Sequence, residues 1–189
     1  MPKIEDVTVI WSSVSGALDY MKNPKTGLTP AQYEAALGKL TEDQRAAFSK
    51  SRLAWDRVPL LAVNRLTEEV AKAKGEDIEA FARRIGRHTA EKSPLLKTFA
   101  MLMTPASTLK VASQIWQKIY GAGQIKVETT PTGAIMTVSD FPSQPVGCAR
   151  VSGWVEVIIE AAGGKKVSSK HTKCIARNAT ECVWDLTWE

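Results

Sequence analysis

The sequence predicts an α+β fold, in which an N-terminal helical layer is followed by a β-β-α-β-β segment with a four-stranded antiparallel sheet. Apolar residues recur at helical spacing through most of residues 1–123, and beyond Gly121-Ala122-Gly123 the spacing changes to two. The length of 189 residues suits one compact unit with its own core. We therefore expect a single domain over 1–189, with a helical part at 1–123 and an α/β part with antiparallel hairpins at 124–189.

Proline, glycine and capping residues mark the boundaries of the predicted helices. At the start of residues 6–22 every second residue is apolar, and after Ser12 the apolar residues have helical spacing. A turn follows at 23–27. Proline at the first helical position and the capping-box pattern are start signals, and glycine after the last turn is a stop signal. These signals predict helices that begin at Thr29-Pro30 and Thr41-Glu42-Asp43-Gln44, cover 59–74 and 76–92, begin again at Ser93-Pro94, and run from Thr104-Pro105 to Tyr120.

Two hairpins and one helix are predicted after the glycines. Residues 125–130 and 134–138 flank the turn Pro131-Thr132-Gly133, which indicates the first hairpin. Residues 145–163 suit a buried helix, although the β-branched residues of 155–159 also fit a strand. A second hairpin is predicted over 166–176 and 182–188.

Composition and charge exclude several classes of protein. Three cysteines are too few and too odd in number for a secreted disulfide framework, and no secretory leader or membrane span is found in the sequence. We therefore expect a cytoplasmic protein. The net charge of +5 is spread over interspersed acidic and basic residues, without a basic patch that includes aromatics. This pattern argues against a nucleic-acid partner.

The second hairpin carries two of the three cysteines. If its turn centres on Asn178, Cys174 and Cys182 lie opposite each other and point to the apolar face of the sheet. One interpretation is a buried pair of reduced, small hydrophobic residues. The other is a metal or redox site, of which two thiols are only half a tetrahedral zinc set. We expect no stoichiometric zinc, since only these two thiols are predicted to converge; if zinc were bound, Glu160 or His171 would be the missing ligand to test.

The remaining polar candidates have simple structural interpretations. His88 and His171 belong to no local ligand motif, and a structural role is expected for both. Glu156 and Glu160 lie one helical turn apart and fit a solvated helix face. No glycine-rich phosphate loop, nucleophile elbow or His-Glu-x-x-His pattern occurs. We therefore expect no catalytic residues and no enzymatic activity.

The C-terminal half of the sequence resembles a known family of domains. Ser152-Gly153-Trp154, Gly163-Gly164 and the Cys174-x7-Cys182 pair followed by alternating aromatics resemble the 4-vinyl-reductase-type domain of the nitric-oxide-signalling and Golgi-transport ligand-binding superfamily. The rest of the chain is similar to a myxobacterial paralogous family, through Arg84-Ile85-Gly86-Arg87, Thr104-Pro105 and the segment 116–123.

The resemblance implies a sensor or carrier fold. Related domains hold aromatic effectors, haem or acyl chains between helices and sheet, and they often dimerise through the helical part. In phenol-sensing relatives the hairpin cysteines join a zinc site completed from the preceding helix; that position falls near Ile159, which cannot coordinate, with Glu160 beside it. The Tyr-x-Ser-x-Arg motif of a haem site is absent. No cofactor is therefore assigned.

The function expected from the sequence is a non-catalytic sensor or regulatory module that binds a small hydrophobic ligand between helices and sheet. The alternative is a protein-interaction or scaffold module with a filled pocket. The partner is accordingly a small molecule or a protein, with a homodimer formed through the helical part. The residues expected around the ligand are aromatic or aliphatic side chains that could equally form the core: Trp116, Tyr120, Trp154, Ile158 and Trp184.

Overall fold

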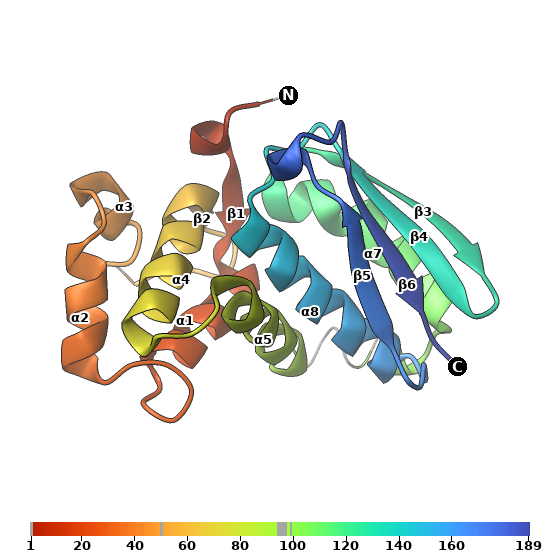
Figure 1. The fold of residues 1–189 in the computed structure, drawn as a ribbon, viewed down its shortest axis with the longest axis horizontal. Helices are drawn as coiled ribbons and strands as arrows, with labels where there is room; N and C mark the ends of the chain where they lie inside the picture. Colours follow the sequence, from red (N-terminus) through yellow and green to blue (C-terminus); the bar gives the residue numbers. More distant parts are fainter. Residues whose placement is uncertain (1, 50, 94–97, 99) are drawn as a thin grey trace.

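The computed structural model describes residues 2–49, 51–93, 98 and 100–189, and it confirms the predicted α+β class. Across those residues it contains seven α-helices, a two-stranded sheet in the order β1-β2 and a four-stranded sheet in the order β3-β4-β6-β5. All strand pairs are antiparallel. In Figure 1 helices α1 to α4 gather at one end and the larger sheet at the other, with α5 and α8 between them.

The N-terminal layer follows the predicted start and stop signals. Thr29 and Thr41 each cap a helix through a complete capping box, and Gly75 ends another in the left-handed conformation. The predicted start at Ser93-Pro94 lies partly outside the described residues, whereas the start at Thr104-Pro105 is confirmed. The elements of this layer are β1 (Thr8–Ile10), α1 (Ser15–Lys22), α2 (Pro30–Gly38), α3 (Glu42–Ala46), β2 (Arg57–Pro59), α4 (Leu60–Lys74) and α5 (Ile78–Glu91).

Two helices cover one face of the four-stranded sheet. The strands are β3 (Gln124–Thr130), β4 (Gly133–Ser139), β5 (Ser168–Lys173) and β6 (Cys182–Thr187), and the helices are α7 (Pro105–Tyr120) and α8 (Pro145–Ala161) (Figure 1). Met136 pairs with Trp184 in the central ladder, and both are buried. Residues 155–159 are helical, so the alternative of a strand there is wrong. Burial on almost every side explains why they resemble one.

Helices α5 and α8 cross unusually closely at a pair of glycines. A Cβ atom on Gly86 would lie 1.9 Å from the carbonyl oxygen of Arg150, and one on Gly153 would lie 1.9 Å from that of Arg83. Neither position has space for any larger residue unless the backbones separate. The two glycines therefore set the distance between the helical layer and the α8–sheet unit.

The crossing also buries an acidic residue that the sequence placed on a solvated face. Glu156 is only 4% exposed and accepts hydrogen bonds from Arg83, Arg87 and Ser169, the last at 2.7 Å. The solvated-face interpretation is wrong for Glu156 and right for Glu160, which is exposed and pairs with Arg87 at 2.8 Å. Helical spacing places Glu156 and Glu160 on the same face of α8, but α5 and β5 cover only Glu156.

The second hairpin departs from the predicted strands. β5 ends at Lys173, a bulge lies between His171 and Lys173, and residues Ile175–Arg177 form a 3-10 turn. The predicted strand over 166–176 is thus wrong at its end. Asn178 adopts the left-handed conformation with a φ of 67°, as expected for the centre of the turn.

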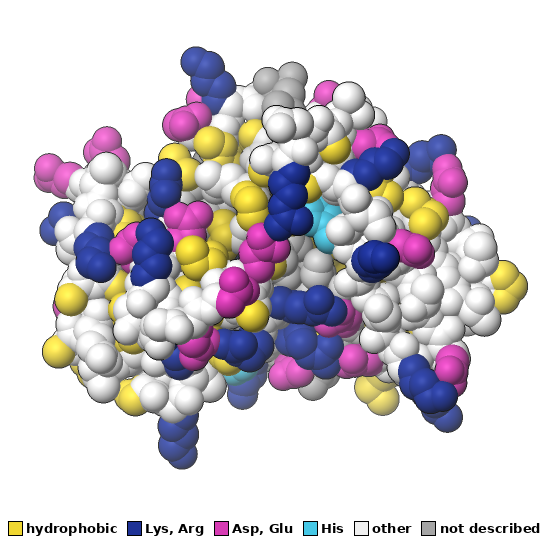
Figure 2. Space-filling model, in the orientation of Figure 1, with side chains coloured by type: hydrophobic (Ala, Val, Ile, Leu, Met, Phe, Trp, Pro, Cys, Tyr) yellow, Lys and Arg dark blue, Asp and Glu magenta, His cyan; other side chains and the backbone are white. Residues whose placement is uncertain are grey.

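The surface mixes charges of both signs. Figure 2 shows Lys and Arg interspersed with Asp and Glu over the face drawn. Across the part of the chain that is described, no helix combines the length and the hydropathy that a membrane crossing requires.

Candidate metal centre and adjoining cavity

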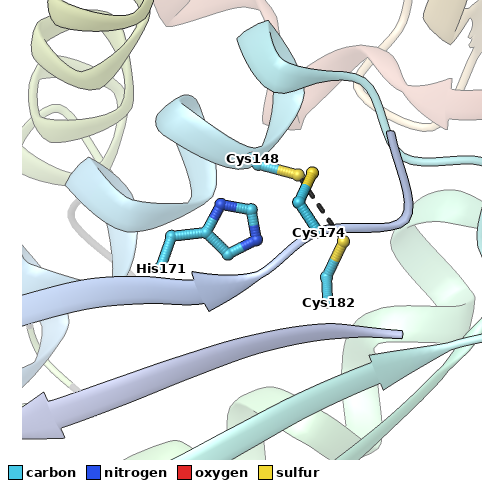
Figure 3. A group of neighbouring side chains, drawn as sticks. All are labelled: Cys148, His171, Cys174 and Cys182. Carbon is cyan, nitrogen blue, oxygen red and sulfur yellow. Dashed lines mark hydrogen bonds between the residues drawn. The ribbon is translucent and has the colours of Figure 1, made fainter. Parts of the chain in front are cut away.

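All three cysteines of the chain and one of its two histidines meet at a single point. Cys148 comes from α8, His171 from β5, Cys174 from the loop after β5, and Cys182 from the start of β6. Their ligand atoms all lie within 4.8 Å of one another, and Figure 3 shows the four side chains directed toward a common centre. Residues from three elements thus form one cluster of soft donor atoms.

Strand register and the position of α8 produce this convergence. Lys173 pairs with Val183, which brings Cys174 alongside Cys182 immediately beyond the ladder. Cys148 is the fourth residue of α8, and its Sγ atom lies 3.8 Å from that of Cys182 at the start of β6. The three cysteines are buried, and none forms a disulfide.

Two of the four residues in this cluster, Cys174 and Cys182, are predictable as neighbours from the sequence. The prediction that Cys174 and Cys182 are buried and reduced is confirmed. The expectation that only two ligands converge is wrong, because α8 contributes Cys148 near its N-terminus rather than a residue near Ile159, which is fully buried in the core. The spacing of His171, three residues before Cys174, is the one local signal that could have indicated a fourth ligand.

Hydrogen bonding and burial divide the three thiols into one acidic and two weakly acidic groups. The Sγ atoms of Cys148 and Cys182 lie 3.8 Å apart, and the backbone N–H of Ile175 donates to Cys182 Sγ at 3.4 Å. Donation from Cys148 lowers the pKa of Cys182 to about 4 despite burial. The same hydrogen bond, together with burial, raises the pKa of Cys148, and burial raises that of Cys174. The cluster therefore holds one thiolate between two protonated thiols.

His171 is held in place with one ring nitrogen unused. Its ring stacks on Trp184 at a centroid distance of 4.3 Å and an interplanar angle of 15°. Trp184 Nε1 in turn donates to Ser152 Oγ at 2.8 Å, and Ser152 Oγ donates to the carbonyl oxygen of Cys148 at 3.2 Å. His171 Nε2 is buried and has no hydrogen-bond partner. The His171 side chain also helps to lower the pKa of the Cys182 thiol, so this ring faces the sulfur cluster.

A cavity lies beside α8. It has a volume of about 60 Å³ and lies between α5, α7, α8 and the strands β3 and β4. Trp116, Tyr120 and Trp154, three of the residues expected around a ligand, line it. Ile158 is 1% exposed and belongs to the core, and Trp184 lines a smaller cavity of about 20 Å³ that reaches Cys148. The structure therefore brings three of the five expected residues to one cavity.

Comparison with known proteins identifies the fold. No family model matches the chain, and no curated protein matches it. Among solved structures it is similar to an iron(II), unliganded H-NOX protein variant from K. algicida, with a TM-score of 0.68, 13% identity and coverage of 95% of this chain and 96% of that one.

Structures from a second organism agree. An H-NOX protein from S. oneidensis in the Fe(II)NO state gives a TM-score of 0.62 at 13% identity, with coverage of 94% and 98%. The H-NOX domain from Shewanella oneidensis in the Fe(II)CO state gives 0.64 at 14% identity, with coverage of 94% and 97%. At such low identity these likenesses concern the fold, and they show that the chain has the fold of H-NOX domains.

Proposed function

We propose that this chain is a non-catalytic sensor module of the H-NOX fold, stabilised by a zinc ion and responsive to a small hydrophobic ligand. The observation that carries the proposal is the convergence of Cys148, His171, Cys174 and Cys182 within 4.8 Å. The ligand part is supported by the cavity beside Trp116, Tyr120 and Trp154. The alternative, a protein-interaction module with a filled pocket, would leave this cavity without a ligand.

The chemistry of the donor set favours zinc. Three thiol sulfurs and one imidazole nitrogen form one of the common structural zinc sets, and thiolates select soft or borderline metals over magnesium and calcium. Cys182 already provides a thiolate, and His171 Nε2 has no other partner. The residues present therefore fit the ion.

The architecture of the site favours a structural role for zinc. Four protein ligands complete a tetrahedral shell, whereas catalytic zinc sites keep a position for water or substrate. Zinc would supply a positive charge that keeps all three thiols ionised and a cross-link among the segments that carry them. Trp184 orients His171 by stacking, and Ser152 connects Trp184 to the helix that holds Cys148. These residues thus fix α8 to the β5–β6 hairpin.

The cavity lined by Trp116, Tyr120 and Trp154 does not fit haem. The larger cavity measures about 60 Å³, whereas pockets for drug-sized ligands measure roughly 300–1,000 Å³. Its described lining residues include neither histidine nor cysteine. His88 instead packs against Tyr20 with the two rings tilted at 59° and their centroids 5.0 Å apart. The proposed function therefore involves no haem.

The test is metal content together with a matched pair of histidine variants. We expect one zinc per chain in protein purified without chelator, and a lower Tm after zinc is removed. His171→Asn should lower zinc occupancy and Tm, whereas His88→Asn, at the only other histidine, should keep its zinc. Equal zinc content in the two variants, or a wild-type protein that takes up no zinc, would contradict the proposal.

A further inference from the structure

Arg150 is a buried cation, and its Nη1 atom has no hydrogen-bond partner among the residues that the structure describes. It lies on α8 and is only 7% exposed. None of the ion pairs formed by the described residues includes it. Arg83 and Arg87, at the crossing of α5 with the same helix, both pair with Glu156. The acidic residues of α8 therefore pair with arginines of α5 and not with Arg150.

Both cavities beside α8 are lined by Arg150. The larger one contains no Asp or Glu among its described lining residues, and neither does the smaller one. The polar side chains of the larger cavity besides Arg150 are Ser13, Thr89, Ser113 and Tyr120, together with the indole groups. A buried charge with no counter-ion is strongly unfavourable, so Arg150 would stabilise an anion that enters this cavity.

The rest of the larger cavity is apolar and aromatic. Trp116 and Tyr120 lie with their ring centroids 4.2 Å apart, and Trp154 faces the same space from α8. The indole N–H of Trp116 already donates to the carbonyl oxygen of Ala122 at 3.0 Å, so this residue offers the cavity mainly its ring. A ligand here meets one cation at one side and aromatic surface around the remainder.

We propose that this cavity binds a small carboxylate with a compact apolar body. The carboxylate would accept hydrogen bonds from the Arg150 guanidinium, and the body would pack against Trp116, Tyr120 and Trp154. The guanidinium fork matches a carboxylate in shape, and a single cation matches a monoanion rather than a dianionic phosphate. A volume of about 60 Å³ favours a short-chain carboxylate such as propionate over an aromatic acid or a long acyl chain, since a cavity that holds benzene measures about 150 Å³. The inference rests on the proposed sensor function and gives its ligand a chemical class.

A water molecule is the competing occupant. Asn64 Oδ1 is also buried without a partner and, like Arg150, lines the smaller cavity of about 20 Å³. A water between these two groups would satisfy both of them without any ligand. The two possible occupants, a carboxylate and a water, predict different effects of an added acid. If a water already satisfies Arg150, the added acid should not bind there.

The experiment compares each acid with its neutral isostere on the full, zinc-loaded chain. Thermal melts and calorimetry would use acetate against acetamide, and propionate against propionamide. We expect both acids to raise Tm with concentration and both amides to leave it unchanged. Arg150→Met should weaken binding of the acids by roughly tenfold to a hundredfold, because it removes charge-assisted hydrogen bonds. Arg65→Met, at an exposed arginine on α4, is the matched control and should bind as wild type does.

Three outcomes would overturn the inference: no shift with either acid, equal shifts with acid and amide, or undiminished binding by Arg150→Met. Arg150→Lys, which keeps the charge but not the fork, provides a second variant if the Met variant does not fold, and it should bind the acids more weakly than wild type. Zinc content is measured on the same samples. A zinc-loaded chain that ignores carboxylates therefore contradicts this inference alone, and a zinc-free chain contradicts the proposed function.

Discussion

At the scale of single residues, the cluster is organised by which thiol carries the negative charge. Cys182 accepts hydrogen bonds from Cys148 Sγ and from the Ile175 backbone N–H, and its pKa falls to about 4. Burial and the charge of Cys182 raise the pKa of Cys174, and the hydrogen bond to Cys182 raises that of Cys148. In the zinc-free protein at pH 8, Cys182 is thus ionised and the other two thiols are protonated.

This division predicts the number of protons released when zinc binds. Zinc requires three thiolates, so at pH 8 Cys148 and Cys174 should each release one proton and Cys182 none. Calorimetric titration of the chelator-treated protein with zinc in buffers of different ionisation enthalpy measures that number. We expect about two protons per zinc, as the two raised pKa values require. As pH falls toward 4, Cys182 also becomes protonated, so the number of protons released should rise while the affinity for zinc decreases. A value of three already at pH 8 would show that Cys182 is not ionised in the zinc-free protein.

At the scale of elements, the contact between α5 and α8 depends on two glycines. Gly86 and Gly153 permit the close crossing that places Arg83 and Arg87 beside the buried Glu156. The same helix, α8, presents Cys148 to the hairpin and Arg150 to the cavities. The position of α8 therefore affects both the cluster of cysteines and histidine and the two cavities.

The crossing predicts a large cost for one added methyl group. Gly153→Ala places a Cβ atom 1.9 Å from the carbonyl oxygen of Arg83, so the backbones must separate. We expect the free energy of unfolding to fall by about 3 kcal/mol, at the upper end of overpacking costs. Gly38→Ala, at the exposed end of α2 with nothing within 4 Å, is the control and should be neutral or stabilising by up to about 1 kcal/mol. Urea unfolding of both variants measures the difference, and equal stability of the two would contradict the close crossing.

At the scale of the whole molecule, local signals predicted the architecture well. Capping boxes at Thr29 and Thr41, the left-handed glycine Gly75 and the change of period after Gly123 led to the correct class, the described α-helices and the four-stranded sheet, whereas the small β1-β2 sheet was not predicted. These features act within a few residues of the chain, so they can be read without the tertiary structure.

The site was predictable only in part, because its residues meet through tertiary packing. Cys174 and Cys182 share a hairpin, and their burial followed from its register. Cys148 reaches them only because α8 lies across that hairpin, which nothing local to Cys148 specifies. Glu156 and Arg150 were missed for the same reason, since α5, β5 and α7 decide which polar side chains become buried. Spacing along one element does not contain that information.

The central claim is that three cysteines and one histidine hold zinc and join α8 to the β5–β6 hairpin. X-ray absorption at the zinc edge of the purified protein tests it most directly. The account predicts three sulfur ligands at about 2.3 Å and one nitrogen ligand at about 2.0–2.1 Å, with the nitrogen lost in His171→Asn. A shell dominated by oxygen, or one that is unchanged in His171→Asn, would contradict it.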